Sequence, residues 1–96
     1  MGKEVESAII RNMKECIVCG SPYIQVHHVF GASNRKISDR YGYIVPLCML
    51  HHTAGPASVH FNRDFDLHLK KVSQKHFEAQ NGTRDEFIRI FGRNYL

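Results

Sequence analysis

The stretch CIVC at residues 16–19 and the stretch CMLH at residues 48–51 decide the fold. Each begins and ends with a metal-ligand residue, and two residues separate the ligands in both. The four ligands are Cys16, Cys19, Cys48 and His51. A gap of two residues lets one turn present both ligands to one ion, and structural zinc sites use four such ligands in a tetrahedron. The sequence therefore predicts one structural Zn²⁺ held by two turns.

The residues between the two ligand pairs favour a hairpin that closes this site. Residues 23–30 (YIQVHHVF) and 43–47 (YIVPL) are rich in β-branched and aromatic residues and predict two strands. Pro46 makes the second strand an edge strand or shortens it. Residues 31–42 are polar and bounded by glycines, which predicts a long loop. An antiparallel pairing of the strands would bring the two ligand pairs together.

Three further segments have the periodicity of helices. Residues 4–14 and residues 64–80 carry apolar residues at helical spacing, and the second ligand pair opens a short helix between them. Thr83 and Glu86 form a capping box, in which each side chain satisfies a free backbone N–H at the start of a last helix. The predicted fold class is α+β: an antiparallel hairpin plus a helix, flanked by N- and C-terminal helices.

Length and composition limit the chain to one small domain. It has 96 residues, with a zinc-stapled core expected at about 14–62 and a C-terminal helical part at about 63–96. A core of this size often needs a metal or a disulfide for stability. No apolar run reaches the roughly 18 residues of a membrane span, and the first residues lack the apolar stretch of a secretory signal. We therefore expect a cytoplasmic protein with reduced thiols and no membrane partner.

The cysteines have two other interpretations. Each could be a small buried apolar residue, with His51 simply exposed to solvent. The pair Cys16 and Cys19 could also be a redox centre, which would need a βαβ context that the sequence lacks. Two matched pairs at the ends of one hairpin favour zinc over both.

The seven histidines exceed what the zinc site needs. His27 and His28 form a doublet on the first strand, where neighbouring side chains point to opposite faces. His52 follows the zinc ligand His51 on a helix, where neighbours point about 100° apart. One histidine of each doublet can therefore face the hairpin. His68 and His76 lie among lysines and are expected at the surface.

The motifs CIVCG, VHHVFG and VPLCMLHH, between residues 16 and 52, resemble those of HNH nucleases of the ββα-metal (His-Me finger) group with a zinc knuckle. In that group a hairpin and the following helix hold one divalent ion. The resemblance implies that His27 and His52 bind this catalytic ion and that His28 is the general base that activates water. His60 would be a third metal ligand or a phosphate contact, and a packing or exposed histidine is the alternative.

The C-terminal segments resemble a narrower group. FNRDFDLHLKK at residues 61–71 and RDEFIRIFGRNYL at residues 84–96 are similar to segments of the small phage and prophage nucleases of the RecA-dependent recombination-enhancement (Ref-like) family. This resemblance implies DNA as substrate and a RecA-type recombinase filament or other phage proteins as partners.

The sequence departs from the HNH pattern at one position. The middle Asn of the motif, which helps to orient the base, would fall at Tyr43. The side chain of Tyr43, the side chain of Asn34 or a backbone carbonyl could take its place.

The resemblance also implies a cofactor and a reaction. A catalytic Mg²⁺ or Mn²⁺ would bind the scissile phosphate, and histidine ligands also suit Zn²⁺ or Ni²⁺. A histidine accepts a proton from water near neutral pH, and cleavage would leave 5′-phosphate and 3′-hydroxyl ends.

Positive charge supplies the expected DNA-binding surface. The chain has 13 Lys and Arg against nine Asp and Glu, for a net charge of +4. Arg35, Lys36 and Arg40, in the stretch between the strands, are the candidate phosphate contacts. The sequence thus predicts a metal-dependent DNA endonuclease. A non-catalytic zinc module that binds DNA or protein is the alternative, favoured by Tyr43, and a redox or metal-handling protein is a third.

Overall fold

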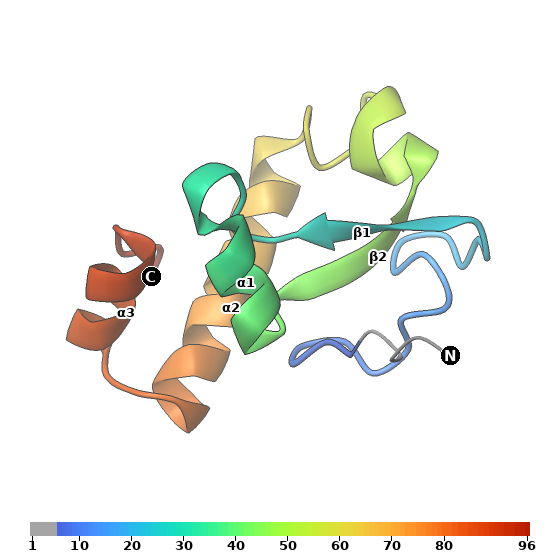
Figure 1. Cartoon of the computed structure of the whole chain (residues 1–96). Coiled ribbons are helices and arrows are strands. Elements are labelled where there is room, and N and C mark those ends of the chain that lie inside the picture. The colour runs from blue at the N-terminus through green and yellow to red at the C-terminus, as the bar shows by residue number, and fades with distance from the viewer. Residues whose placement is uncertain (1–5) are drawn as a thin grey trace.

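The β-branched residues between the ligand pairs form a hairpin in the computed structural model, which describes residues 6–96. Strand β1 (Ile24–His28) pairs antiparallel with β2 (Ile44–Cys48), so that Ile24 lies opposite Cys48 and His28 lies opposite Ile44 (Figure 1). All of β2 is buried. Pro46 is tolerated there because the sheet has only two strands, and its carbonyl accepts a hydrogen bond from the Ile17 N–H at 3.0 Å.

The connection between the strands is helical, so the predicted loop over residues 31–42 is wrong. A short turn of helix, η1 (Ala32–Asn34), leads into α1 (Arg35–Tyr41). The buried Ser38 hydroxyl donates to the Tyr43 carbonyl at 2.6 Å and accepts from the Phe30 N–H at 3.2 Å, which ties α1 to both strands. The charged residues of this stretch, Arg35, Lys36, Asp39 and Arg40, lie on the exposed side of this helix.

The helix predicted over residues 4–14 is also absent from its described part, residues 6–14; residues 4 and 5 lie outside the described residues. The backbone N–H groups of Ile9 and Ile10 donate to the Ser7 hydroxyl, each at 3.1 Å. The Ala8 N–H donates to the carbonyl of Gly42 at 2.7 Å. This segment therefore packs its isoleucines on the core as irregular chain held at the end of α1.

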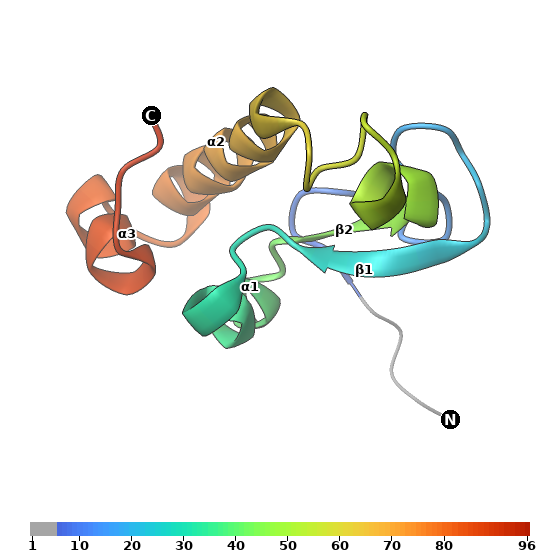
Figure 2. The ribbon, with the colours of Figure 1, turned by 90° about the horizontal axis from the view of Figure 1, so that it is seen from above.

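The C-terminal part forms two helices where the sequence predicts them. Helix α2 (Arg63–Gln80) begins at Asn62, whose side chain accepts the Phe65 N–H. Helix α3 (Arg84–Phe91) begins with the expected capping box of Thr83 and Glu86. Helix α3 lies at the far end of the molecule from the zinc-ligand turns (Figure 2), whereas the first turns of α2 lie close to Val18 and His51.

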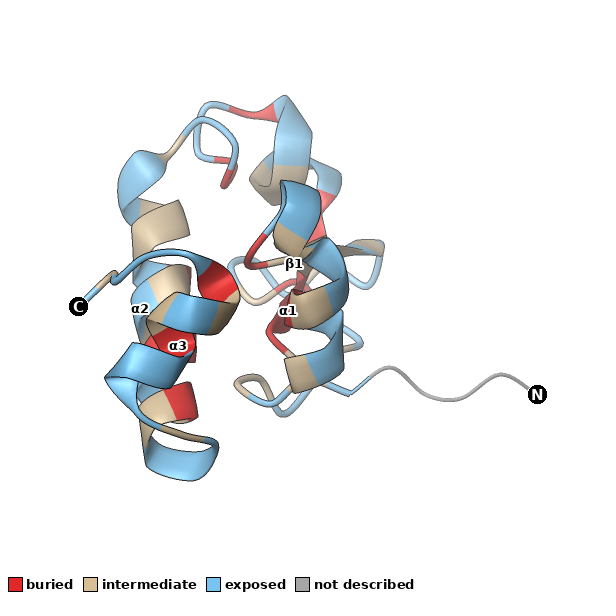
Figure 3. Ribbon diagram, turned by 60° about the vertical axis from the view of Figure 1, so that its left-hand side comes forward, coloured by how far each residue is buried: buried red, intermediate tan, exposed pale blue. Residues whose placement is uncertain are grey.

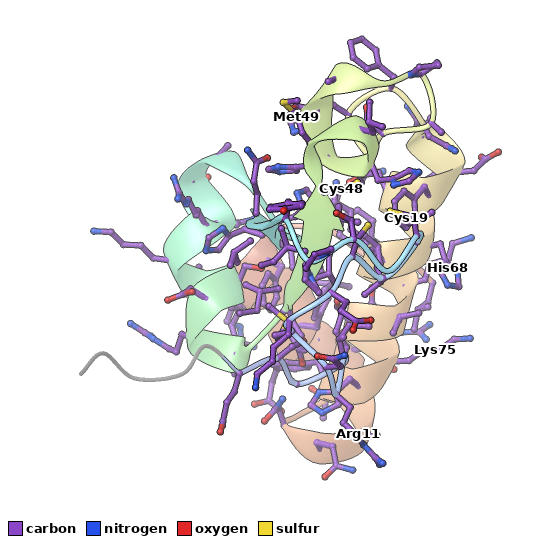
Figure 4. All side chains as sticks on the ribbon, turned by 90° about the vertical axis from the view of Figure 1, so that its right-hand side faces the viewer. Arg11, Cys19, Cys48, Met49, His68 and Lys75 are labelled. Carbon is purple, nitrogen blue, oxygen red and sulfur yellow. The ribbon has the colours of Figure 1, made fainter. Side chains whose placement is uncertain are left out.

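The core lies where the hairpin, α2 and α3 meet, and β2, α2 and α3 all carry residues coloured as buried in Figure 3. Phe30, just after β1, contacts aromatic rings of α3 and of the chain end, among them Phe91 at 4.5 Å between ring centroids. Tyr43 is fully buried, and its hydroxyl lies 3.1 Å from Nδ1 of His76. His76 is therefore half-buried and fastens α2 to the hairpin, contrary to its predicted surface position, whereas His68 is exposed on α2 (Figure 4).

The two ends of the hairpin contact different parts of the protein. One end carries the turn of Cys16 and Cys19, and the other faces α1 and the helical core. Within residues 6–96, no helix is both long enough and apolar enough to cross a membrane.

Candidate metal centres

The structure brings the four predicted zinc ligands to one point. Their ligand atoms all lie within 4.8 Å of one another. The sulfurs of Cys19 and Cys48 are 3.6 Å apart, and Nδ1 of His51 lies 3.2 Å from the Cys48 sulfur. In a tetrahedral zinc site, two sulfurs lie about 3.8 Å apart, and a sulfur and a nitrogen about 3.5 Å apart. The Cys3His cluster therefore has the dimensions to hold one metal ion such as zinc.

Backbone hydrogen bonds fix the turn that carries the first two ligands. The Gly20 N–H donates to the Cys16 carbonyl at 2.8 Å, and the Cys16 N–H donates to the Ser21 carbonyl at 2.9 Å. Gly20 has a φ of +77°, which a residue with a side chain rarely adopts. The turn is thus a rigid loop held against β2, which ends in the third ligand.

The thiol pKa values show how the cluster favours a bound cation. Burial raises the pKa of Cys16, but backbone N–H groups of both turns and the His51 ring outweigh burial and lower it to about 6. At Cys19 the backbone N–H of Ser21 lowers the pKa, yet burial and the two neighbouring sulfurs outweigh it and raise the pKa. Crowded thiolates repel one another, and a divalent cation between them removes this repulsion.

A second cluster consists of three histidines from three segments. His27 comes from β1, His52 from the short helix η2 (Leu50–Ala54), and His60 from the loop before α2. One nitrogen of each ring lies within 4.8 Å of one nitrogen of each other ring. The ring centroids are 5.2 Å apart for His27 and His52 and 5.4 Å for His52 and His60. His60, the uncertain residue of the sequence prediction, thus lies with the other two.

The chain path after η2 brings His60 back to the strand. Gly55 is buried so close to the Leu50 carbonyl that an added Cβ would lie 2.7 Å from this oxygen. The Val59 N–H then donates to the His51 carbonyl at 2.8 Å. This hydrogen bond fixes the residue before His60 to η2, so one short helix supports both clusters: His51 faces the cysteines and His52 faces the histidines.

Two hydrogen-bonding features fit the second cluster to a metal ion. The Nε2 of His27 is buried and has no hydrogen-bond partner among the described residues, which is rare for a buried polar atom. The Nδ1 of His52 lies 2.7 Å from the side-chain oxygen of Gln25. Since this oxygen only accepts, Nδ1 carries the hydrogen and Nε2 keeps its lone pair. Such support of a metal-ligating imidazole by a neighbouring acceptor is common.

The lowered pKa values of His27 and His52 favour the neutral form of these two rings. Burial lowers the pKa of His27 to about 4, with help from the neighbouring rings of His52 and His60, while Asp66 acts in the opposite direction. Burial and His60 lower the pKa of His52 as well. Neutral imidazoles bind metals, so protons compete little with an ion at neutral pH.

His28 has a separate environment from the three clustered rings. Its Nε2 lies 3.3 Å from Oδ1 of Asp39, which α1 carries. The His28 side chain is 16% exposed and the Asp39 side chain is 65% exposed, so solvent reaches this pair. An ionised carboxylate only accepts hydrogen bonds, which assigns the hydrogen to Nε2 and leaves the lone pair on Nδ1.

Neither side chain expected to replace the motif Asn contacts His28 in this way. The Tyr43 hydroxyl is buried between His76 and Asn81, and the Asn34 amide donates to the Phe91 carbonyl at 2.9 Å. Asp39 and Gln25 are the two polar partners that sequence reasoning missed. No local motif marks either one, because each contact joins segments far apart in the chain.

The predicted phosphate contacts lie beside this site. Arg35, Lys36 and Arg40 are all exposed, and all lie on α1, the helix that carries Asp39. None makes an ion pair with a described acidic residue. Their charges are therefore free to meet an anionic partner.

Together, the hairpin, the helices and the Cys/His clusters define a small α+β protein with a possible metal site. Comparisons of the chain with known protein families, with curated proteins and with solved structures found no match. The function of the protein must therefore be inferred from the geometry of its site.

The two clusters predict a metal stoichiometry that can be measured. We expect the purified chain to bind two ions, one at the cysteines and one at the histidines. His60→Asn removes one exposed imidazole from the histidine cluster. It is expected to lower the affinity for the second ion by at least about tenfold and to leave the binding of the first ion and the fold unchanged. Titration with Co²⁺, followed by absorption, separates the thiolate site from the histidine site.

The matched control is His68→Asn, which removes an exposed histidine outside both clusters. Equal Co²⁺ binding by the His60→Asn and His68→Asn chains would show that His60 is not a ligand.

Proposed function

We propose that the chain is a metal-dependent DNA endonuclease of the HNH, or ββα-metal, type. The observation that carries the proposal is the convergence of His27, His52 and His60 beside a fourth histidine, His28, that is held by a carboxylate. A strand, a short helix and a loop supply the three rings, and the Cys3His cluster anchors the same short helix. This combination provides an ion site and, at the next residue of β1, a base that is not a metal ligand.

In the proposed hydrolysis of a phosphodiester, metal binding and proton transfer are carried out by different histidines. His27, His52 and His60 would hold a divalent ion, which supplies positive charge to the scissile phosphate and to the leaving oxygen. Three protein ligands leave positions for phosphate and water. His28 stays off the ion because adjacent strand residues point to opposite sides. Its Nδ1 takes the proton of the attacking water, and Asp39 accepts the hydrogen on Nε2 and fixes the ring.

The ligand set also bears on the choice of ion. Mg²⁺ prefers oxygen ligands, whereas imidazole suits Zn²⁺ and Ni²⁺. Three histidine ligands therefore favour Ni²⁺ or Zn²⁺ over Mg²⁺ at this site, and the preference for Mn²⁺ is intermediate. Of the ions that the resemblance implies, Mn²⁺ is the better working ion for this cluster.

The charge on α1 supports DNA as the substrate. Arg35, Lys36 and Arg40 lie exposed on the helix that carries Asp39, so a strand bound there passes His28. Contacts of this kind bind phosphates of any sequence. We propose cleavage with low sequence specificity and, from the C-terminal resemblance, a recombinase filament as a partner that presents the DNA.

The test is cleavage of supercoiled and of single-stranded DNA by the purified, zinc-loaded chain. Reactions contain Mg²⁺, Mn²⁺, Ni²⁺ or added Zn²⁺, with and without a RecA-type filament. We expect nicking with Mn²⁺ or Ni²⁺ that a chelator stops. Failure to cut under all of these conditions would overturn the proposal.

Asp39 allows a sharper test of the arrangement around His28. Asp39→Asn keeps an oxygen that accepts from Nε2, so we expect it to retain most of the cleavage rate. Asp39→Ala removes the acceptor, and a lost hydrogen bond to a charged group corresponds to a fall in kcat of about tenfold or more, with little change in KM. Single-turnover cleavage at saturating DNA measures this ratio.

Lys36→Ala is the control for Asp39, because it lies on the same helix, is exposed and has no contact with His28. We expect it to raise KM and to leave kcat unchanged. If Asp39→Ala left kcat unchanged, as Lys36→Ala is expected to do, the contact of Asp39 with His28 would have no part in the chemical step.

One feature favours a second candidate, a non-catalytic zinc module that binds another macromolecule. Met49, Leu50 and Phe61 are large apolar side chains exposed near the histidine cluster in sequence. Such residues are enriched in binding surfaces. DNA binding without cleavage under every metal condition above would favour this candidate.

A further inference from the structure

A small cavity lies next to the end of β1, and neither the metal clusters nor the α1 charges include it. Its volume is about 320 Å³. It lies between the segment that follows β1, helix α2 and the C-terminal tail. The lining residues are Phe30, Gly31, Ala32, Asn34, Lys70 and Tyr95. This volume suits a single nucleotide unit rather than a large ligand.

The lining combines one cation, Lys70, with two aromatic rings, Phe30 and Tyr95, and contains no carboxylate. The Lys70 ammonium lies 5.7 Å from the centroid of the Tyr95 ring. Asp66, one turn earlier on α2, binds the same ammonium at 2.8 Å from outside the lining and fixes its position. An ammonium has three hydrogens, so two remain for an anion.

The C-terminal tail is held in place by a buried network. Gln74 is fully buried on α2, and its side-chain oxygen accepts the Tyr95 N–H at 2.8 Å. Its nitrogen donates to Asn94 at 2.7 Å. The Arg93 guanidinium lies 5.1 Å from the Tyr95 ring centroid. Tyr95 is thus presented at the cavity by fixed partners.

The cavity lies close to the proposed cutting centre. Phe30 is two residues after His28, so their Cα atoms are at most about 7 Å apart. One strand of B-form DNA advances about 3.4 Å along its axis for each nucleotide, so two nucleotides span this distance.

We infer that this cavity is a nucleotide subsite for a single-stranded stretch next to the scissile phosphate. Lys70 binds a backbone phosphate, and the Tyr95 ring contacts the base of the same nucleotide. The inference rests on the proposed nuclease function and narrows its substrate: a base contacts an aromatic ring in this way only when it is unpaired. Stacking on aromatic rings tolerates any base, in keeping with low sequence specificity.

The test measures binding separately from cleavage. A fluorescein-labelled short single strand is titrated into the zinc-loaded His28→Ala chain, at several salt concentrations. Lys70→Gln is expected to weaken binding and to lower the slope of log affinity against log salt by about 0.7, the share of one phosphate contact in a single strand. Tyr95→Leu is expected to weaken binding about tenfold without changing the slope. Tyr95→Phe keeps the ring and should bind like the parent.

Two controls separate the subsite from general charge and from folding. Lys75→Gln makes the same charge change on an exposed residue of the same helix, pointing outward in Figure 4, and should leave the slope unchanged. A strand of the same length with abasic sites should bind equally to the parent and to Tyr95→Leu, since it offers no base to the ring. Circular dichroism verifies that each variant is folded.

The outcomes distinguish the subsite from the enzyme. If the wild-type chain cuts DNA while Lys70→Gln and Tyr95→Leu bind single strands like Lys75→Gln, the subsite is wrong and the nuclease stands. If the expected pattern of binding is found in a chain that never cuts, the subsite stands and the catalytic proposal falls. A wild-type chain that binds no single strand overturns the subsite, and one that also cuts no DNA overturns both.

Discussion

Replacing Cys19 with serine is expected to release the structural zinc and to unfold the chain. Structural zinc contributes about 10 to 16 kcal/mol of binding free energy in zinc-finger peptides at neutral pH. A small domain has a total stability of about 5 to 15 kcal/mol. Loss of one of four ligands therefore removes an amount comparable with the whole stability of this protein.

Cys19 is the most informative of the three cysteines for this test. Cys16 and Cys48 are buried, so serine at either position would also disturb packing. Cys19 is exposed, and a substitution at an exposed position usually changes stability by no more than about 0.5 kcal/mol. Unfolding of the Cys19→Ser chain would therefore report the loss of the metal ligand and little else.

Metal content, measured by atomic emission, and thermal melting, followed by circular dichroism, are the two readouts. Val18→Ser is the matched control, because Val18 belongs to the same turn, is 51% exposed and is not a ligand. It should keep its zinc and melt like the wild type. A Cys19→Ser chain that melts with the wild-type midpoint would show that the Cys3His cluster does not stabilise the fold.

The part of the site that could be predicted from sequence is the part set by short-range patterns. The spacing of Cys16 and Cys19 fits one turn. The strands at 24–28 and 44–48 pair as a hairpin, and this pairing places the two ligand pairs at the same end of it. The same holds for the capping box at Thr83, whose two hydrogen bonds span only three residues.

The missed elements depend on contacts between distant segments. The N-terminal segment has the helical period, but the Ala8 N–H donates to the distant Gly42 carbonyl and not to a carbonyl of its own segment. Tertiary hydrogen bonds therefore replace the helix. Helix α1 forms over a polar stretch because Ser38 bonds to both strands, and no pattern within residues 31–42 shows this. Since Asp39 lies on α1, its contact with His28 could not be predicted without the helix.

His76 shows the same limit for a single residue. A histidine among lysines on a long helix is normally exposed, and the sequence prediction followed this rule. The position instead faces Tyr43, because the hairpin places this tyrosine's hydroxyl under α2. The rings of His27, His52 and His60 meet for a comparable reason: the return of the chain at Gly55 is a tertiary feature.

The second large effect is expected for His28→Ala, which should lower the rate of DNA cleavage by about 10²- to 10⁴-fold. This is the usual contribution of a positioned general base. His28 is outside the three-histidine cluster, so the variant should bind both metal ions as the wild type does. Its affinity for DNA should also persist, because Arg35, Lys36 and Arg40 remain on α1.

This combination distinguishes a base from a metal ligand. His27→Ala should also abolish cleavage, but it should lose the second ion, since the buried Nε2 of His27 points to no other partner among the described residues. His68→Ala, an exposed histidine on α2, should cut at the wild-type rate. The measurement is single-turnover nicking of supercoiled DNA, with Co²⁺ stoichiometry determined on the same preparations.

Two results would reassign His28. Nicking by His28→Ala at the wild-type rate would mean that water is activated by another group, and the contact with Asp39 would then be structural. Loss of the second ion together with activity would place His28 among the ligands. Retention of both ions with loss of the chemical step is the outcome that the proposed mechanism predicts, because the contact of Asp39 with Nε2 leaves only Nδ1 of this ring to accept a proton.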